Sequence, residues 1–243
     1  MPLPAGPIEL SVVIPVRNEA GNILPLLAEI DRVAQDFAHE VLVVDDGSTD
    51  ATPARLGQAL ACYPRLRVLR GKVTRGQSAA VWTGVRQARG TWIFTLDGDG
   101  QNDPADLPRL WQAREGIDMV VGHRVQRRDS WAKRTGSRLA NGLRAWLLGD
   151  ATPDSATGIK LFRRALFLEL PYFDHMHRFL PALALRHGGR VVSVPVNHRP
   201  RLTGRSNYGQ LGRLAVGIID LLGVRWLQRR ARFPIDFEEL RRR

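Results

Sequence analysis

The chain forms its first structural unit from Leu10-Ser-Val-Val-Ile-Pro-Val16, a helical pattern over residues 22–37, and Glu40-Val-Leu-Val-Val44. The first and last of these runs are rich in β-branched residues, which favour buried strands. Apolar residues recur at helical spacing between them, at Ile23, Leu26, Leu27, Ile30 and Val33. A strand, a helix and a second strand in this order are typical of a crossover between parallel strands. We therefore predict a parallel sheet that begins at residue 10.

The same alternation continues along the first two thirds of the chain. It predicts further strands over residues 67–69, 92–96 and 119–121, and further helices over 51–61, 77–88 and 104–114. This order indicates an α/β fold with a mostly parallel open sheet flanked by helices. We also expect helices over 164–170 and 179–187, and two short strands over 190–195 and 196–199. Ligands of such sheets bind beyond the carboxyl ends of the strands, so the residues that follow each strand are the first candidates for a site.

Composition limits the class of protein. The chain has 243 residues, 44% of them hydrophobic and 25% charged, which excludes a disordered basic tail protein. The single cysteine, Cys62, excludes an intrachain disulfide and a multi-cysteine metal site. No targeting segment and no apolar run of about 18 residues stands out, so we expect a cytoplasmic chain without a membrane span. The net charge of +12 calls for an anionic partner: nucleic acid, a membrane surface or phosphate-bearing small molecules.

The most informative strand end reads Thr95-Leu-Asp-Gly-Asp-Gly-Gln-Asn-Asp103. Two Asp residues one position apart can place carboxylate oxygens on one Mg²⁺ and leave room for phosphate oxygens and water. The stretch departs from a calcium-binding EF-hand, because Pro108 stands where the final Glu of that loop belongs. A plain turn is the alternative, since Asp and Gly are common in turns.

Two further strand ends are polar, Pro15-Val-Arg-Asn-Glu19 and Asp45-Asp46-Gly-Ser-Thr-Asp50. They can contact a ribose or a base, or they can open the helices that follow, with Thr49 or Asp50 as a cap. The fingerprints of P-loop proteins, dinucleotide-binding folds, zinc proteases and serine hydrolases are absent from the sequence. Kinase, dehydrogenase and hydrolase functions therefore lose support.

Residues 122–144 form a strongly basic segment, whose second half we expect to be helical. One face of that helix carries Lys133, Ser137, Asn141 and Arg144, and another carries Trp131, Thr135, Leu139, Leu143, Trp146 and Leu147. We favour an anion-binding role for the basic face over a merely solvated one, because seven cations fall within 21 positions: Arg124, Arg127, Arg128, Lys133, Arg134, Arg138 and Arg144.

The C-terminal stretch is predicted to form an amphipathic helix with apolar and basic residues. Its apolar residues are Leu211, Leu214, Ala215, Ile218, Leu221, Leu222 and Trp226, and its basic ones are Arg213, Arg225, Arg229, Arg230 and Arg232. Such a helix can lie in a membrane interface or pack on its own domain, and the sequence leaves both open.

Five motifs in this order and spacing resemble the family 2 glycosyltransferases, which have the GT-A fold. They are Pro15-Val-Arg-Asn-Glu19, Val43-Val-Asp-Asp-Gly-Ser-Thr-Asp50, Gly76-Gln-Ser-Ala-Ala80, Leu96-Asp-Gly-Asp-Gly-Gln-Asn-Asp-Pro104 and Gly122-His-Arg124. The chain is most similar to the dolichol-phosphate mannose synthase branch, which includes undecaprenyl-phosphate sugar transferases. The resemblance implies a catalytic domain over residues 1–208, followed by a basic amphipathic helix and tail over 209–243.

The resemblance also implies roles for single residues. It assigns Mg²⁺ or Mn²⁺ to Asp97 and Asp99, with Gln101 as a third ligand. It places the nucleotide sugar on Pro15, Val16, Glu19, Asp45, Asp46, Gln77 and Asp97, with Arg201 and Ser206 on a loop that closes over the diphosphate. It assigns the acceptor phosphate to Arg124, Lys133, Arg134 and Ser137, and it places Asp154 near the sugar. The residues implied to be catalytic are Asp97, Asp99, Arg124 and Asp154.

The chemistry of a lipid phosphate acceptor agrees with these residue types. A phosphate monoester has a second pKa of about 6, so its attacking oxygen is already anionic near neutral pH and needs no strong base. The reaction instead needs a cation on the departing diphosphate and fixed positive charge for the acceptor. We therefore expect inverting, metal-dependent transfer from a UDP- or GDP-sugar to a polyprenyl phosphate, for cell-envelope glycan or lipopolysaccharide assembly.

The sequence and the resemblance also lead to expectations about the location, the partners and the donor sugar of the enzyme. We expect the enzyme at the cytoplasmic face of the inner membrane, held by anionic lipid, a membrane-protein partner or its own oligomerisation. A sugar-phosphate nucleotidyltransferase and a nucleic-acid-binding module are the alternatives, although no Phe or Tyr interleaves the arginines to stack on bases, so we expect no nucleic acid partner. Lys160, His177 and Arg178 can read an acidic sugar such as galacturonate, whereas His175 and His177 can equally be ordinary polar residues.

Overall fold

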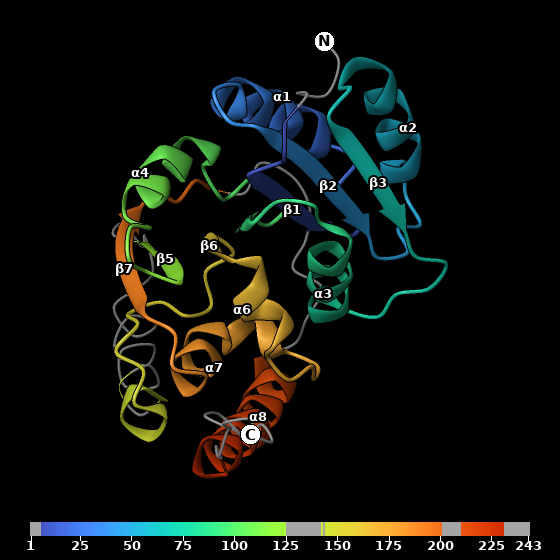
Figure 1. Ribbon diagram of the computed structural model, residues 1–243. Helices are drawn as coiled ribbons and strands as arrows, with labels where there is room; N and C mark the ends of the chain where they lie inside the picture. Colours follow the sequence, from blue (N-terminus) through green and yellow to red (C-terminus); the bar gives the residue numbers. More distant parts are fainter. Residues whose placement is uncertain (1–5, 125–141, 143, 201–209, 231–243) are drawn as a thin grey trace, which may run out of the picture.

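The computed structural model describes residues 6–124, 142, 144–200 and 210–230 (Figure 1). The described residues form one seven-stranded sheet with the order β3-β2-β1-β4-β6-β5-β7. Its strands are β1 (Leu10–Val16), β2 (His39–Asp45), β3 (Leu66–Arg70), β4 (Trp92–Thr95), β5 (Met119–Arg124), β6 (Lys160–Arg163) and β7 (Val191–Val196). The helices are α1 (Ile23–Ala34), α2 (Thr52–Cys62), α3 (Gln77–Gln87), α4 (Leu107–Gln112), α6 (Arg164–Leu168), α7 (Leu180–Arg186) and α8 (Gln210–Arg229), with short 3₁₀ helices η1 (Pro104–Asp106) and η2 (Met176–Arg178).

Helices cover both faces of the sheet. Alternate side chains of a strand point to opposite faces, so Val12 and Ile14 of β1 pack with α1, α2 and α4, whereas Val13 packs with α3, α6 and α7. In Figure 1, α8 lies beyond α7, on the second of these faces. The predicted α/β class and the mostly parallel sheet are confirmed. β6 is the exception, because it runs antiparallel to both of its neighbours, β4 and β5.

The five predicted strands and the main predicted helices are present, and the differences are local. The helix expected over 104–114 is divided into η1 and α4, because Pro104 and Pro108 each begin a helical segment. The two short strands expected over 190–199 are a single strand, β7, followed by an isolated bridge between His198 and Asn102. Pro195 interrupts the run without ending β7, because β7 lies at the edge of the sheet, where a missing N–H is tolerated.

The predicted basic face of residues 122–144 is wrong at Arg144. This side chain is buried, forms an ion pair with Asp150, and donates from Nη2 to the Thr152 carbonyl oxygen over 2.7 Å. Trp146, expected on the apolar face, is 79% exposed, and Leu148 is buried instead. The carboxylate of Asp150 follows the turn at Gly149 and draws the guanidinium into the domain, which the helical spacing alone does not reveal. Lys133, Ser137 and Asn141 lie outside the described residues.

α8 packs on its own domain with one side and leaves apolar side chains exposed on another. Val224 is buried against the domain, and Leu221 packs against the same cluster. Ile218, Ile219, Leu222 and Trp226 are exposed, each by more than half of its surface. The boundary expected between residues 208 and 209 lies outside the described residues. None of the described helices is both long enough and apolar enough to span a bilayer.

Two helical glycines provide a matched test of the packing. A Cβ on Gly84 of α3 would lie 2.4 Å from Val13 Cγ1, whereas a Cβ on Gly57 of α2 would meet nothing within 4 Å. We expect Gly84→Ala to lower the free energy of unfolding by about 1–3 kcal/mol through overpacking. Gly57→Ala should raise it by about 0.5–1 kcal/mol, because alanine is the better helix former. Urea denaturation measures both, and a change of the same sign for the two variants would contradict this packing.

Candidate active site

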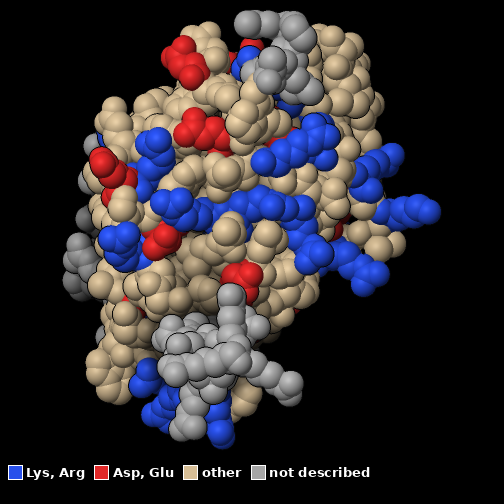
Figure 2. Space-filling model, in the orientation of Figure 1, with Lys and Arg blue, Asp and Glu red and all other residues tan. Residues whose placement is uncertain are grey.

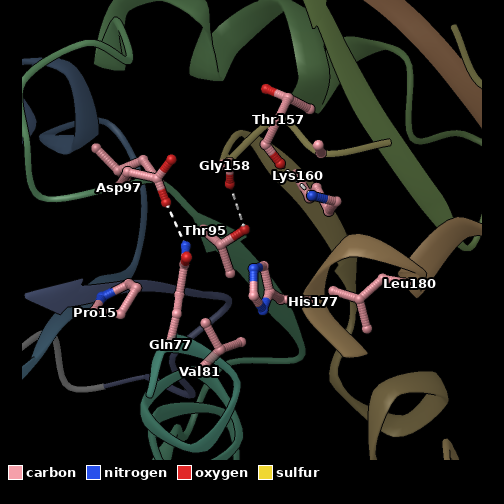
Figure 3. Close-up of a pocket in the computed structure, with 12 residues that line it drawn as sticks. Pro15, Gln77, Val81, Thr95, Asp97, Thr157, Gly158, Lys160, His177 and Leu180 are labelled. Atoms are coloured by element: carbon pink, nitrogen blue, oxygen red, sulfur yellow. Dashed lines mark hydrogen bonds between the residues drawn. The ribbon is translucent and has the colours of Figure 1, made fainter. Parts of the chain in front are cut away.

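A pocket lies at the carboxyl ends of β1 and β4 (Figure 3). Pro15 at the end of β1 and Asp97 just after β4 form one side of it. Gln77, the first residue of α3, points toward Asp97. The opposite side comes from the segment that leads into β6 and from η2, with Thr157, Gly158, Lys160 and His177. Pro15 and Asp97 thus meet at the ends of two strands, as predicted, and Gln77 from α3 lies beside them.

Asp97 is held on two sides. Its Oδ1 accepts a hydrogen bond from Gln77 Nε2 over 2.7 Å, and its backbone N–H donates to Asn102 Oδ1 over 2.7 Å. Burial, followed by repulsion from Asp99, raises the pKa of Asp97 to about 6, against the opposing effect of Lys160 and other groups. A divalent cation beside the two carboxylates would reverse this shift by favouring the charged form.

Gly158 allows β6 to approach the turn that carries the acidic residues. Thr95 Oγ1 donates to the Gly158 carbonyl oxygen over 2.9 Å. A Cβ on Gly158 would lie 2.3 Å from Asp97 Oδ2 and 2.6 Å from Asn102 Oδ1, both below van der Waals contact. The sequence motifs give Gly158 and Asn102 no role, although Asn102 lies within the motif Leu96–Pro104. Their part in the site is visible only once β6 is paired with β4.

The expected metal ligands fit a divalent cation in chemical type. Asp97 and Asp99 supply carboxylates, and Gln101 has an amide oxygen, all of which are hard oxygen donors. Asp99 Oδ1 also accepts from the Gln101 backbone N–H over 3.1 Å, so this turn is ordered by its own hydrogen bonds. Among the described residues, no group of three or more His, Cys, Asp or Glu side chains is arranged around a metal position. Two carboxylates leave other coordination positions for substrate oxygens and water.

Arg124 and Asp154, predicted for the acceptor and the sugar, contact each other. Arg124 Nε and Nη2 donate to the two carboxylate oxygens of Asp154 over 2.6 and 2.9 Å. This bidentate pair fixes the plane of the guanidinium at the end of β5. The other residues predicted for the acceptor phosphate, Lys133, Arg134 and Ser137, lie outside the described residues.

Lys160 and His177 line the pocket with different charge states. Burial lowers the pKa of Lys160 to about 8, against the attraction of Asp97 and Asp154, so the ammonium form dominates at neutral pH. Burial, reinforced by Lys160 and Arg178, lowers the pKa of His177 to about 3 and keeps its ring neutral. His177 Nδ1 lies 2.7 Å from Ser78 Oγ. Of the alternatives left open for His177, the structure favours the ordinary polar residue over the cation.

Asp46 organises the loop before α3. Its carboxylate accepts from Thr74 Oγ1, Arg75 N and Gly76 N over 2.7–2.8 Å. The neighbouring carboxylate of Asp45 is fully buried and accepts from Ser48 N over 2.9 Å. Both Asp residues thus hold backbone, and their contact with a nucleotide stays a prediction.

The first strand end is also tied to the loops around it. Glu19 N donates to Thr52 Oγ1 over 2.8 Å, and Glu19 Oε2 accepts from Asn22 Nδ2 over 2.6 Å. Pro15 and Val16 are buried at the end of β1. Asp50 Oδ1 accepts from Thr52 N over 2.9 Å, but the N-cap of α2 is Ala51, so the prediction that Thr49 or Asp50 caps this helix is wrong.

The chain that leads toward Arg201 is anchored beside the acidic turn. Arg199 N donates to the Gln101 carbonyl oxygen over 2.9 Å. The guanidinium of Arg199 bridges Glu29 and Asp103 with hydrogen bonds of 2.7 and 2.6 Å. Arg201 and Ser206, predicted to close over the diphosphate, lie outside the described residues.

Comparison with known proteins places this geometry in a family. The family model for glycosyl transferase family 2 matches residues 11–170, which carry the acidic turn, Arg124 and Gly158. The chain belongs to this family. It is therefore a glycosyltransferase, as the resemblance implies.

Two curated relatives are similar over most of the chain. Dodecaprenyl-phosphate galacturonate synthase of Rhizobium johnstonii is 33% identical over 96% of this chain and 71% of its own length. Undecaprenyl-phosphate 4-deoxy-4-formamido-L-arabinose transferase of Edwardsiella ictaluri is 35% identical over 82% of this chain. The alignment spans 63% of that second relative, so the chain corresponds to less than two thirds of its length.

Solved structures agree with the GT-A fold. Glucosyl-3-phosphoglycerate synthase from Mycobacterium tuberculosis, crystallised with Mn²⁺, UDP and phosphoglyceric acid, has a TM-score of 0.67 at 23% identity, covering 90% of this chain and 78% of that one. A mannosyltransferase from Pyrobaculum calidifontis in complex with GDP-Man and Mn²⁺ has a TM-score of 0.63 at 22% identity, covering 96% of this chain and 67% of that one. At these identities the likeness establishes the fold.

The contact between Gly158 and Asp97 gives a prediction for catalysis. We expect Gly158→Ala to lower the rate of glycosyl transfer about 100-fold, because the added methyl group displaces Asp97 or Asn102 by a large part of an ångström. Gly57→Ala, remote from the site, is the matched control and should keep the wild-type rate. Transfer rates of folded protein, checked by circular dichroism, measure the effect. A folded Gly158→Ala variant of wild-type activity would contradict it.

Proposed function

We propose that this glycosyltransferase transfers a sugar from a UDP- or GDP-sugar to a polyprenyl phosphate and inverts the anomeric configuration. The observation that carries the proposal is the pairing of two kinds of charge across one pocket. Asp97 lies on one side and Lys160 on the other, and Asp99 and Arg124 add charges of the same two signs that act on Asp97. An acidic side suits a cation with a diphosphate, and a basic side suits an anionic acceptor.

The residues take the following parts in this reaction. Asp97 and Asp99, with the amide oxygen of Gln101, would hold Mg²⁺ or Mn²⁺. When bound, the cation neutralises the charge that develops on the departing nucleoside diphosphate. Arg124, oriented by Asp154, holds the acceptor phosphate in line with the bond that breaks. An acceptor oxygen forms the new bond at the anomeric carbon as the bond to the diphosphate breaks, and no proton has to be removed.

The acceptor class is supported by the two curated relatives, whose names specify dodecaprenyl phosphate and undecaprenyl phosphate. The divalent metal and the nucleotide are supported by solved structures that contain Mn²⁺ with UDP or GDP-Man. The relatives' names specify two different sugars, so the donor sugar has to be identified by experiment. We further propose a peripheral position at the cytoplasmic face of the inner membrane, with residues 209–243 toward anionic lipid and with a membrane-protein partner or a second copy of the chain as additional support.

Asp99→Ala tests the reaction. We expect at least about a 100-fold loss of lipid-linked sugar, because the diphosphate loses its bound cation. The assay incubates protein with Mg²⁺ or Mn²⁺, polyprenyl phosphates of short and long chain and a panel of UDP- and GDP-sugars, and measures new lipids by mass. Exposed Asp36 of residues 35–38, changed to Ala, is the control and should leave turnover unchanged.

Two results would contradict the proposal. The first is transfer to lipid phosphate that Asp99→Ala leaves unchanged. The second is release of pyrophosphate from a nucleoside triphosphate and a sugar phosphate, which would indicate a nucleotidyltransferase.

Arg124→Gln tests the acceptor side separately. We expect the KM for polyprenyl phosphate to rise about tenfold or more, with a smaller change in the KM for the nucleotide sugar, because one charge-assisted contact to the acceptor is lost. Exposed Arg89, changed to Gln, controls for the loss of one positive charge. Equal changes in both KM values would argue against an acceptor role for Arg124.

A further inference from the structure

An open groove of about 300 Å³ lies away from the pocket of Asp97, where α8 meets α7 and the helical residues 144–148. Hydrogen bonds across its floor hold these helices together. Gln228 Nε2 donates to the Leu148 carbonyl oxygen over 2.6 Å, and Arg186 Nε donates to the Leu227 carbonyl oxygen over 3.0 Å. The groove is lined by Leu148, Leu185, Arg186, Arg225, Gln228 and Arg229. The groove is therefore formed before any ligand binds.

The lining of this groove is strongly basic. It contains three arginines and no acidic residue. Within the described part of the chain, the side chains of Arg225 and Arg229 have no hydrogen bond or ion pair. The acidic residue of α8, Asp220, is engaged elsewhere, with His175 Nδ1 at 3.0 Å from its Oδ2. Figure 2 shows Lys and Arg side chains at the lower end of the face drawn, where Figure 1 places α8. The charges of Arg225 and Arg229 are thus available to an anion.

The groove adjoins an exposed apolar surface on the same helix. At 3.6 residues per turn, Arg225 and Arg229 fall with Ile218, Ile219, Leu222 and Trp226 in one arc of about 120° of α8. Ile219 is 69% exposed, and Leu222 and Trp226 are each 59% exposed. Arginines beside large apolar and aromatic side chains match the layering of a membrane interface, where phosphates lie just outside the acyl chains.

We propose that the groove of Arg186, Arg225 and Arg229 binds the phosphate of an anionic phospholipid headgroup while Leu222 and Trp226 enter the acyl region beside it. The planar guanidinium groups of arginine suit phosphate oxygens, and the neighbouring apolar arc favours a phosphate attached to a lipid over a free ion. The proposal uses only the membrane location from the proposed function, and it is independent of the reaction. It gives α8 a specific lipid site in addition to its packing role.

The test is flotation of the full chain with vesicles of phosphatidylcholine, alone or with about 30 mol % phosphatidylglycerol. We expect binding that depends on phosphatidylglycerol and a drop of about tenfold or more in the double variant Arg225→Gln/Arg229→Gln. The control, Arg32→Gln/Arg89→Gln, removes the same charge from two exposed positions outside the groove and should bind like wild type. Leu222→Gln should weaken binding to both kinds of vesicle.

Further experiments distinguish lipid from other anionic ligands, and binding in the groove from glycosyl transfer. Soluble glycerol phosphate should compete poorly, because it lacks the acyl chains. Arg225→Gln/Arg229→Gln should keep wild-type turnover of a short, water-soluble polyprenyl phosphate, whereas Asp99→Ala should lose turnover and still bind vesicles. Equal losses in the two double variants, full competition by glycerol phosphate, or a stronger Arg225/Arg229-dependent binding to duplex DNA than to vesicles would each overturn the proposal.

Discussion

The close approach of Gly158 to Asp97 is the constraint on which the site depends. β6 runs antiparallel between β4 and β5, and this arrangement places Lys160 and the segment around Asp154 beside the turn that follows β4. The approach is possible only because residue 158 has no side chain to meet the carboxylate. The acidic turn comes from the parallel half of the sheet, and the opposite wall of the pocket comes from the segment that leads into β6. The candidate active site therefore forms where the antiparallel strand β6 meets the parallel strands.

Charge is balanced locally around the pocket. Asp97 raises the pKa of the Lys160 ammonium against the effect of burial, and Lys160 lowers the pKa of Asp97 in turn. Arg124 and Asp154 form a second, bidentate pair beside them. Buried charges of opposite sign stabilise each other, but each remains costly to bury. A divalent cation would offset the negative charge of the diphosphate, and Lys160 and Arg124 would offset that of an anionic acceptor, so substrate binding can preserve the balance.

The sequence predicted the sheet well where strands are long, apolar and bounded by turns, as in β1 and β2. It did not predict β6, because Lys160–Arg163 is four residues long and has a charged residue at each end. It placed Arg144 on an anion-binding face, because helical spacing contains no information about the carboxylate of Asp150 beyond the helix end. The convergence of Pro15 and Asp97 was predictable from strand ends, whereas Gln77 was expected only from the family resemblance. The contact at Gly158 was not predictable, because it depends on the pairing of strands that are far apart in the chain.

The loop before α3 connects two parts of the candidate site through hydrogen bonds. Asp46 accepts hydrogen bonds from residues 74–76, and the next residue, Gln77, donates to Asp97. The short segment of residues 74–77 thus links the carboxylate of Asp46, just after β2, to the carboxylate of Asp97, just after β4. A displacement of Asp46 would therefore shift the start of α3 and with it the hydrogen bond from Gln77 to Asp97. The nucleotide role proposed for Asp46 and the metal role proposed for Asp97 would be coupled through this segment.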